Sequence, residues 1–392
     1  MIYTRREIGK LALLALPATR SWAAKPNSVF GGVQVGINAP YSFHNIPGGA
    51  DDILNYMSQT NISAAELRLQ PVEAFLKAPT PWTAPRGGGR GTPRPPLTPE
   101  QKAEQSAVAD AQQKWRLSQS MDGFKAFRKK YEDAGVLIQI VKYDGINTMS
   151  DDVVDYCFQV AKTLGAYAIS CEIPVSQTQR LGQFAAKHKM MVGYHGHGNL
   201  TDPEAFGRLA AWEQAFTYSK FNGANVDIGH FFAATGTSPA EWIQAHHERV
   251  THVHIKDRKA NNGPNMPFGQ GDTPIREILL LMKREKYRFQ ATIEMEYPVP
   301  EGSCMSAMAV TRLRKHAMDA GWLSYAIGYI AAAASGAGQQ ARIILATFGR
   351  NRLNWSHVAP AKCGAPWLGS SSRSMVTAPR SDTVTGRHAP AS

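Results

Sequence analysis

Imidazole and carboxylate side chains end four short apolar runs in the second half of the chain. The first is Gly193–Asn199, which carries His195 and His197 after three apolar residues. Side chains two residues apart on a β-strand point to the same side. Three later runs end in Asp227 and His230, in His254 and Lys256, and in Glu294 and Glu296. Oxygen and imidazole donors that converge from several strands favour a divalent metal centre.

The metal hypothesis depends on the set of residues, because each one alone has a simpler explanation. Asp227 fits a turn cap, His254 a buried core histidine, and Glu294 the partner of a lysine. Mixed carboxylate and imidazole donors suit Mn, Co, Fe or Zn as the cofactor better than Ca, and Mg is a further candidate. The expected ligands are Asp227, His254, Glu294 and, as the fourth, His195, with His197 or Glu172 in reserve.

The elements that position these residues alternate between strand and helix patterns. Strands are expected at 33–37, 64–69, 136–141, 167–173, 190–195, 225–228, 250–255 and 291–295. Helices are expected at 51–60, 151–164, 177–189, 201–220 and 275–286. A further helical pattern ends at 133, and another helix is expected to begin after Ser238. Capping boxes at Thr201–Glu204 and Ser238–Glu241 predict two of the helix starts.

Eight alternating units predict the α/β class and a single (β/α)8 barrel, a TIM barrel, over about residues 28–318. A doubly wound sheet is the alternative, but its site would lie at one switch point rather than draw on many strands. The segment 78–98 is rich in Pro, Gly and Arg. We expect it to be a flexible insert that leaves a strand's carboxyl end and could cover the site.

The first 24 residues have the order of an export signal. Arg5 and Arg6 precede a short apolar run and a small-residue cleavage segment, and the paired arginines resemble the twin-arginine type. We expect a periplasmic or secreted protein without stable membrane association after export, because the run is too short to span a bilayer. An amphipathic first helix is the alternative.

The C-terminal residues 319–392 form a low-complexity segment with few acidic residues. It is expected to be a disordered extension or the product of a late change of reading frame. The formal charge of +12 is concentrated at the two ends of the chain, with +3 in residues 1–24 and +5 in 319–392. The remaining +4 is too weak for a nucleic-acid partner, so none is expected.

The barrel segments resemble the xylose isomerase-like barrels, often labelled sugar phosphate isomerases/epimerases, which include ketose 3-epimerases and inosose dehydratases. The segments that carry the resemblance are Asn225–His230, His252–Arg258, Gly269–Asp272 and Ile293–Glu294. The resemblance runs from about Val33 to Pro298. It implies that Asp227, His254 and Glu294 bind the metal and that His230 and Lys256 line the substrate pocket.

One position departs from the family pattern. Family epimerases commonly have a glutamate where this chain has His195, and that glutamate is a ligand and one of two acid/base carboxylates. The two-glutamate proton shuttle is therefore in question here. Glu172 could substitute, or it could be a turn residue, and both interpretations remain open.

The expected chemistry is isomerisation or epimerisation of a small sugar or keto-sugar. A metal that holds adjacent substrate oxygens stabilises an enediolate, while an acid/base group moves the α proton. The catalytic candidates are Glu294, Glu296, His197, His230 and Lys256, and the substrate-binding candidates are His230, Lys256 and Arg258. The alternatives are a metal-dependent lyase or dehydratase, an endonuclease-like hydrolase and a non-catalytic sugar-binding protein. A homo-oligomer is possible.

Overall fold

Eight parallel strands form a closed barrel in the computed structural model, which describes residues 25–43, 48–83 and 96–297. The strands β2 to β9 follow one another in chain order, and pairing of β2 with β9 closes the ring. They span Val33–Ala39, Ala64–Arg68, Leu137–Tyr143, Ala168–Cys171, Met191–His195, Asn222–Asp227, Val250–Ile255 and Gln290–Ile293. A short β1 (Val29–Phe30) pairs antiparallel with β2. The predicted single barrel is confirmed, and the doubly wound alternative is wrong.

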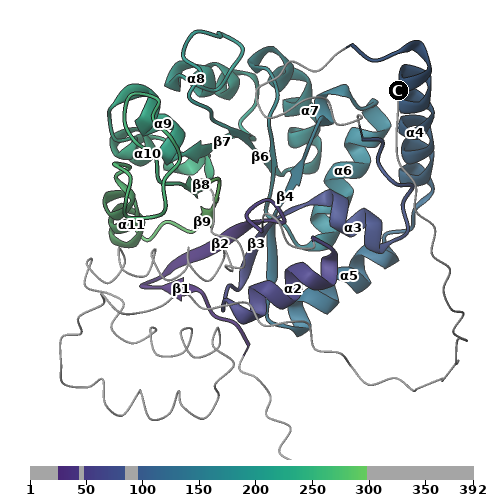
Figure 1. Cartoon of the computed structure of the whole chain (residues 1–392), viewed down its shortest axis with the longest axis horizontal. Helices are drawn as coiled ribbons and strands as arrows, with labels where there is room; N and C mark the ends of the chain where they lie inside the picture. The colour runs from purple at the N-terminus through teal and green to yellow at the C-terminus, as the bar shows by residue number, and fades with distance from the viewer. Residues whose placement is uncertain (1–24, 44–47, 84–95, 298–392) are drawn as a thin grey trace, which may run out of the picture.

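Helices surround the strands, as Figure 1 shows. They are α2 (Ala50–Gln59), α3 (Leu69–Phe75), α4 (Pro99–Ser118), α5 (Asp122–Asp133), α6 (Asp151–Leu164), α7 (Thr178–His188), α8 (Leu209–Tyr218), α9 (Ile228–Thr235), α10 (Ala240–Ala245) and α11 (Ile275–Arg284). Single 3-10 turns lie at Ile146–Thr148, Val175–Gln177 and His247–Arg249. In α11 the apolar spacing Ile275, Ile278, Leu279 and Met282 buries one face of the helix. Helix α4 buries no side chain and lies along the outside of the barrel (Figure 1).

The inside of the barrel is polar, whereas the layer between strands and helices is apolar. The apolar strand residues belong to one buried core cluster. Glu66 on β3 contacts His254 on β8, although β3 and β8 are not neighbours in the sheet. Such a contact crosses the interior of the barrel. The polar interior therefore joins side chains that are far apart in the sequence.

Two of the predicted helix starts are wrong in detail, and the smaller difference is at α10, whose N-cap is Pro239 rather than Ser238. The capping box at Thr201–Glu204 begins no helix, and α8 starts only at Leu209. The Asn199 side chain accepts hydrogen bonds from the backbone N–H groups of Thr201 and Asp202, which holds a turn. The Glu204 carboxylate accepts instead from the N–H of Ser176. A tertiary contact thus takes the group that the capping box would need.

Two helices near the site were not expected. Helix α9 follows β7 directly, and the Asp227 side chain caps it by accepting from the His230 N–H at 2.7 Å. Helix α3 begins as soon as β3 ends. The expected helical pattern up to Asp133 is divided into α4 and α5.

Several predictions fall on residues outside the described part. They are the signal at 1–24, the end of the expected barrel at 298–318, the tail at 319–392 and the middle of the insert at 84–95. Among the described residues, no helix is both long and apolar enough to cross a membrane.

Candidate metal centre

Four candidate metal donors come together where the strands end. They are His195 at the end of β6, Asp227 at the end of β7, His254 near the end of β8 and Glu294 just after β9. Parallel strands bring their carboxyl ends to one mouth of a barrel. One ligand atom of each side chain lies within 4.8 Å of the others, and all four are buried. The structure therefore brings together the four residues predicted as ligands.

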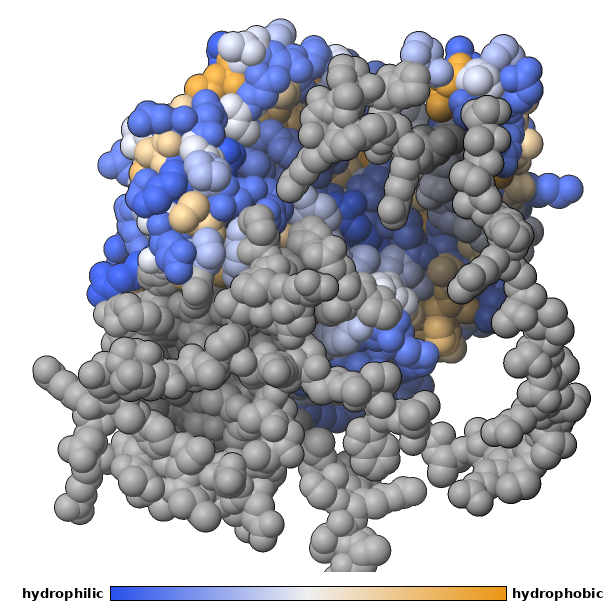
Figure 2. Space-filling view, in the orientation of Figure 1, coloured by the Kyte–Doolittle hydropathy of each residue, from blue (hydrophilic) through white to orange (hydrophobic). Residues whose placement is uncertain are grey.

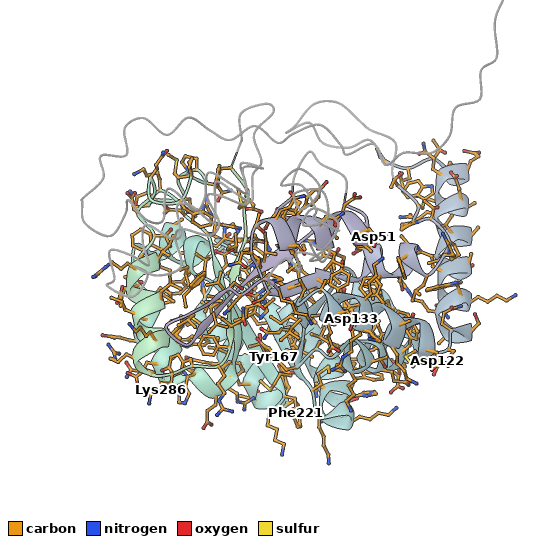
Figure 3. The ribbon with its side chains drawn as sticks, turned by 90° about the horizontal axis from the view of Figure 1, so that it is seen from below. Asp51, Asp122, Asp133, Tyr167, Phe221 and Lys286 are labelled. Carbon is orange, nitrogen blue, oxygen red and sulfur yellow. The ribbon has the colours of Figure 1, made fainter. Side chains whose placement is uncertain are left out.

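The strands end at this mouth of the barrel and begin at the opposite end. Tyr167, Phe221 and Lys286, which precede β5, β7 and β9, all lie in the lower part of the view in Figure 3. In the view of Figure 1, the surface near β4 and β6 is hollowed, and Figure 2 shows hydrophilic residues in that hollow.

The ammonium group of Lys256 lies among the carboxylates of the group. Its Nζ is 3.0 Å from Asp227 Oδ2 and 2.8 Å from Glu294 Oε2, and its side chain is 2% exposed. Burial alone would lower the pKa of Lys256, but the two carboxylates raise it. The carboxylates thus already hold one positive charge between them.

The remaining donors fit a cation as well. His195 Nδ1 and Asp227 Oδ2 are buried and have no hydrogen-bond partner within the described part of the chain. The contact of Asp227 Oδ2 with Lys256 is an ion pair without hydrogen-bond geometry. Burial and the charge of Lys142 hold the pKa of His195 well below its usual range, so the ring is neutral and offers a lone pair. A neutral imidazole and a carboxylate oxygen that lack donors suit a divalent ion.

His254 connects this group to a residue that the sequence did not indicate. Its Nδ1 is 3.0 Å from Glu294 Oε2 and 4.0 Å from Asp227 Oδ2, and its Nε2 is 2.6 Å from Glu66 Oε2. Burial would lower the pKa of His254, but the carboxylates of Glu294 and Glu66 raise it to about 10. The only sequence signal of Glu66 was a carboxylate in a short strand that also contains Arg68.

Glu172 and His197, the reserve ligands, form a pair beside the group. Glu172 Oε1 is 2.6 Å from Lys142 Nζ, and Oε2 is 3.1 Å from His197 Nε2. Burial would raise the pKa of Glu172, but the contacts with His197 and Lys142 lower it. Glu172 is therefore held as an ion-pair partner. His197 also belongs, with His195 and His230, to a second set of donors within 4.8 Å of one another.

The predicted substrate-binding residues adjoin the four donors. His230 Nε2 is 2.8 Å from Lys256 Nζ, and His230 Nδ1 is 2.7 Å from Arg258 Nη1. Burial lowers the pKa of His230 to about 4, so its ring is neutral near pH 7. A neutral imidazole accepts at only one nitrogen. Only one of these two contacts can therefore be a hydrogen bond to the ring at any time.

Glu296 lies beside Lys256 and completes the polar ring around the donors. Its Oε2 is 2.7 Å from Lys256 Nζ and 3.1 Å from Asn265 Nδ2, and its Oε1 accepts from the Tyr41 hydroxyl. Burial would raise the pKa of Glu296, but the charge of Lys256 lowers it. Glu296 is thus an ionised carboxylate with 22% exposure in a fixed position.

Further site residues were not found from the sequence. Asn38 on β2 donates from Nδ2 to Glu294 Oε1 at 2.9 Å. Lys142 on β4 is fully buried and contacts Glu172. Each lies in a mostly apolar strand that contains one further polar residue, Gln34 or Gln139, so the sequence did not single it out.

Comparisons with known proteins agree with the fold. A family model described as xylose isomerase-like TIM barrel matches residues 163–319. A xylose isomerase domain protein from Alicyclobacillus acidocaldarius subsp. acidocaldarius has a similar structure, with a TM-score of 0.52, 17% identity, and coverage of 74% of this chain and 99% of that chain. The IOLI protein, solved with a zinc atom, is similar with a TM-score of 0.51 and 13% identity. The match covers 74% of this chain and 100% of that chain. No curated protein sequence matches. The match at residues 163–319 agrees with the resemblance that the sequence predicted, and the two solved structures agree with the barrel fold.

Proposed function

We propose that this protein is a metal-dependent isomerase or epimerase of a sugar or keto-sugar. The observation that carries the proposal is the buried group of His195, Asp227, His254 and Glu294, whose ligand atoms lie within 4.8 Å of one another. A divalent ion held there would polarise a substrate carbonyl next to a hydroxyl. Zinc in the IOLI protein, which has the same fold, agrees with an ion in this barrel.

Glu296 is the proposed base for the proton α to the carbonyl. Its ionised carboxylate is held by Tyr41, Asn265 and Lys256, and it stays partly open to the mouth. A base must be fixed within hydrogen-bond reach of the proton that it removes. The three contacts restrict Glu296 in this way. The Lys256 ammonium, 2.7 Å away, can donate to an oxygen that gains negative charge.

A second acid/base group is proposed on the other side of the site. His197 contacts Glu172 at 3.1 Å, and its side chain is 47% exposed. The carboxylate can orient the imidazole, which can then give a proton to the substrate or remove one. His230 is the alternative, because its neutral ring lies between Lys256 and Arg258. In this proposal Glu296 and His197 take the place of the two acid/base glutamates of the family epimerases, because His195 stands where one of those glutamates would be.

A lyase or dehydratase is the second candidate, and one observation favours it. Glu296 and Lys256 are a base and an acid only 2.7 Å apart. Such a pair can remove an α proton and protonate a departing β hydroxyl on one face of a substrate. An epimerase needs groups on opposite faces. The position of His197 relative to the bound sugar therefore decides between the two reactions.

The further parts of the proposal concern the cellular setting. We propose export through the twin-arginine signal at 1–24, a small sugar as the partner, and no nucleic-acid partner. The metal is proposed to be Mn, Co, Fe or Zn, which suit mixed carboxylate and imidazole donors, or Mg, which the carboxylates alone would favour.

Proton exchange tests the proposal. The metal-loaded protein is incubated in D2O with a panel of keto-sugars, and NMR follows the α position. An isomerase or epimerase exchanges the α proton and forms a new sugar, whereas a dehydratase forms an unsaturated ketone and releases water. If protein with one bound ion per chain catalyses neither reaction on any panel member, the proposal is wrong for those sugars. Loss of both reactions in Glu296→Gln, with its metal retained, would support the role of Glu296.

A further inference from the structure

We infer that Glu66 is a positioning residue that turns a lone pair of His254 toward the metal centre. The inference rests on the proposed metal site and adds a residue that is not a ligand. Glu66 lies on β3 and His254 on β8, on different sides of the barrel interior.

The His254 ring bridges Glu66 and the metal donors. Nε2 is 2.6 Å from Glu66 Oε2, and Nδ1 is 3.0 Å from Glu294 Oε2. The side chains of Glu66 and His254 are both 0% exposed. Since no bulk water reaches this contact, its geometry is fixed by the barrel. Nδ1 is therefore the nitrogen that faces the donor group.

The chemistry of imidazole makes the contact at Nε2 decisive. A neutral ring carries one N–H and one lone pair, and only the lone pair binds a metal. A carboxylate at Nε2 retains the N–H there, so an ion that binds His254 would displace the proton on Nδ1 and take the lone pair of that nitrogen. Partners of this kind fix the tautomer of metal-binding histidines and raise the basicity of the ring.

The neighbouring His252 does not compete for Glu66. Its Nδ1 is 2.9 Å from Thr251 Oγ1, and that hydroxyl donates its hydrogen to the Ala224 carbonyl. The hydroxyl must therefore accept from an N–H at His252 Nδ1, so His252 Nε2 is a lone pair. At 3.5 Å from Glu66 Oε2, this lone pair cannot donate a hydrogen bond.

The Asn225 amide lies close to the same nitrogen of His254. Nδ2 is 3.0 Å from His254 Nε2, while Asn225 Oδ1 has no hydrogen-bond partner in the described part of the chain. Oxygen and nitrogen of an amide are exchanged by a turn about the last side-chain bond. That turn gives the N–H of His254 a second acceptor, and Ser170 Oγ can then donate to the amide oxygen.

Another arrangement would place an ion between Glu66, His252 and His254, whose ligand atoms also lie within 4.8 Å of one another. Glu66 would then be a direct ligand, and each chain would bind two ions. Metal stoichiometry distinguishes this arrangement from the inference.

The test is a calorimetric titration of Co2+ alone into the metal-free full chain. Glu66→Gln is the main variant, because the amide has the same shape and can donate an N–H to Nε2, which favours the wrong tautomer. Glu73→Gln is the matched control, since Glu73 is also a buried glutamate, held by Arg116 at 2.7 Å. Thermal unfolding followed by circular dichroism checks that each variant folds, and Glu66→Ala serves as a second variant.

We expect one Co2+ per chain in the wild type and in Glu73→Gln, with equal Kd. Glu66→Gln should bind about 10- to 100-fold more weakly. A folded Glu66→Gln protein with the wild-type Kd would overturn the inference and leave the metal site intact. So would two ions in the wild type and one in Glu66→Gln. A wild type that binds no ion would overturn the proposed metal centre together with the inference.

Discussion

Replacing Lys256 by methionine should destabilise the metal-free protein and make its stability depend strongly on metal. Lys256 Nζ lies 2.7 to 3.0 Å from Asp227, Glu294 and Glu296, and these side chains are 0%, 2% and 22% exposed. Methionine keeps much of the length of the side chain and removes its charge. The change leaves buried carboxylates without their cation, which typically costs about 3–5 kcal/mol.

The expected shift follows from the size of the barrel. One kcal/mol changes Tm by about 2 °C in a domain of roughly 250 residues or more. The metal-free Lys256→Met protein should therefore unfold about 6–10 °C below the wild type. A bound divalent ion would return positive charge to the same carboxylates. Added Mn2+ should then raise the Tm of Lys256→Met more than that of the wild type.

Thermal unfolding with chelator and with Mn2+ measures both effects. Lys259→Met is the control, because Lys259 pairs with Asp272 at 2.8 Å while both side chains are about two-fifths exposed. Exposed pairs contribute only about 0–1 kcal/mol. If metal-free Lys256→Met unfolds within a degree or two of the control, the charge argument fails. If Mn2+ raises the Tm of Lys256→Met and of the wild type by the same amount, the proposed effect of the Lys256 charge would also be contradicted.

Three further predictions concern other parts of the chain. His195→Ala should weaken metal binding less than Glu294→Ala does, because it removes a neutral donor and leaves the charge balance unchanged; calorimetry with Mn2+ compares the two. Changing Arg5 and Arg6 together to lysine should keep the protein in the cytoplasm, and its appearance in the periplasm would contradict the twin-arginine assignment. Burial would raise the pKa of Asp155, but Lys187 and His188 lower it to about 2 from 3.8. Its stabilisation, about 1 kcal/mol after solvent screening, should be complete above pH 3.8 and disappear as the pH falls toward 2, as denaturant unfolding of Asp155→Asn would show.

The barrel could be predicted from the sequence because its strands are short apolar runs at regular intervals. All eight observed strands begin or end within three residues of the expected bounds. The donors His195, Asp227, His254 and Glu294 could be named because each ends such a run. Because parallel strands end at the same mouth of a barrel, residues at these ends are expected to lie close together.

Residues inside the barrel could not be placed in the same way. Glu66 and His254 are separated by 188 positions, and their contact depends on which side chains face each other across the interior. No local pattern encodes that register. The helix start at Thr201 failed for a related reason, because Glu204 contacts Ser176, which is 28 positions away. Local capping patterns predict a helix only where tertiary contacts leave the capping groups free.

The most direct test of the metal centre is elemental analysis of the purified full chain beside Glu294→Ala. Glu294 Oε2 lies within 3.0 Å of both His254 Nδ1 and Lys256 Nζ, so its removal should disrupt the donor group without opening the apolar core. We predict one divalent ion per wild-type chain and much less than one in a Glu294→Ala protein that keeps its circular dichroism spectrum. One ion per chain in both proteins would contradict the proposed site.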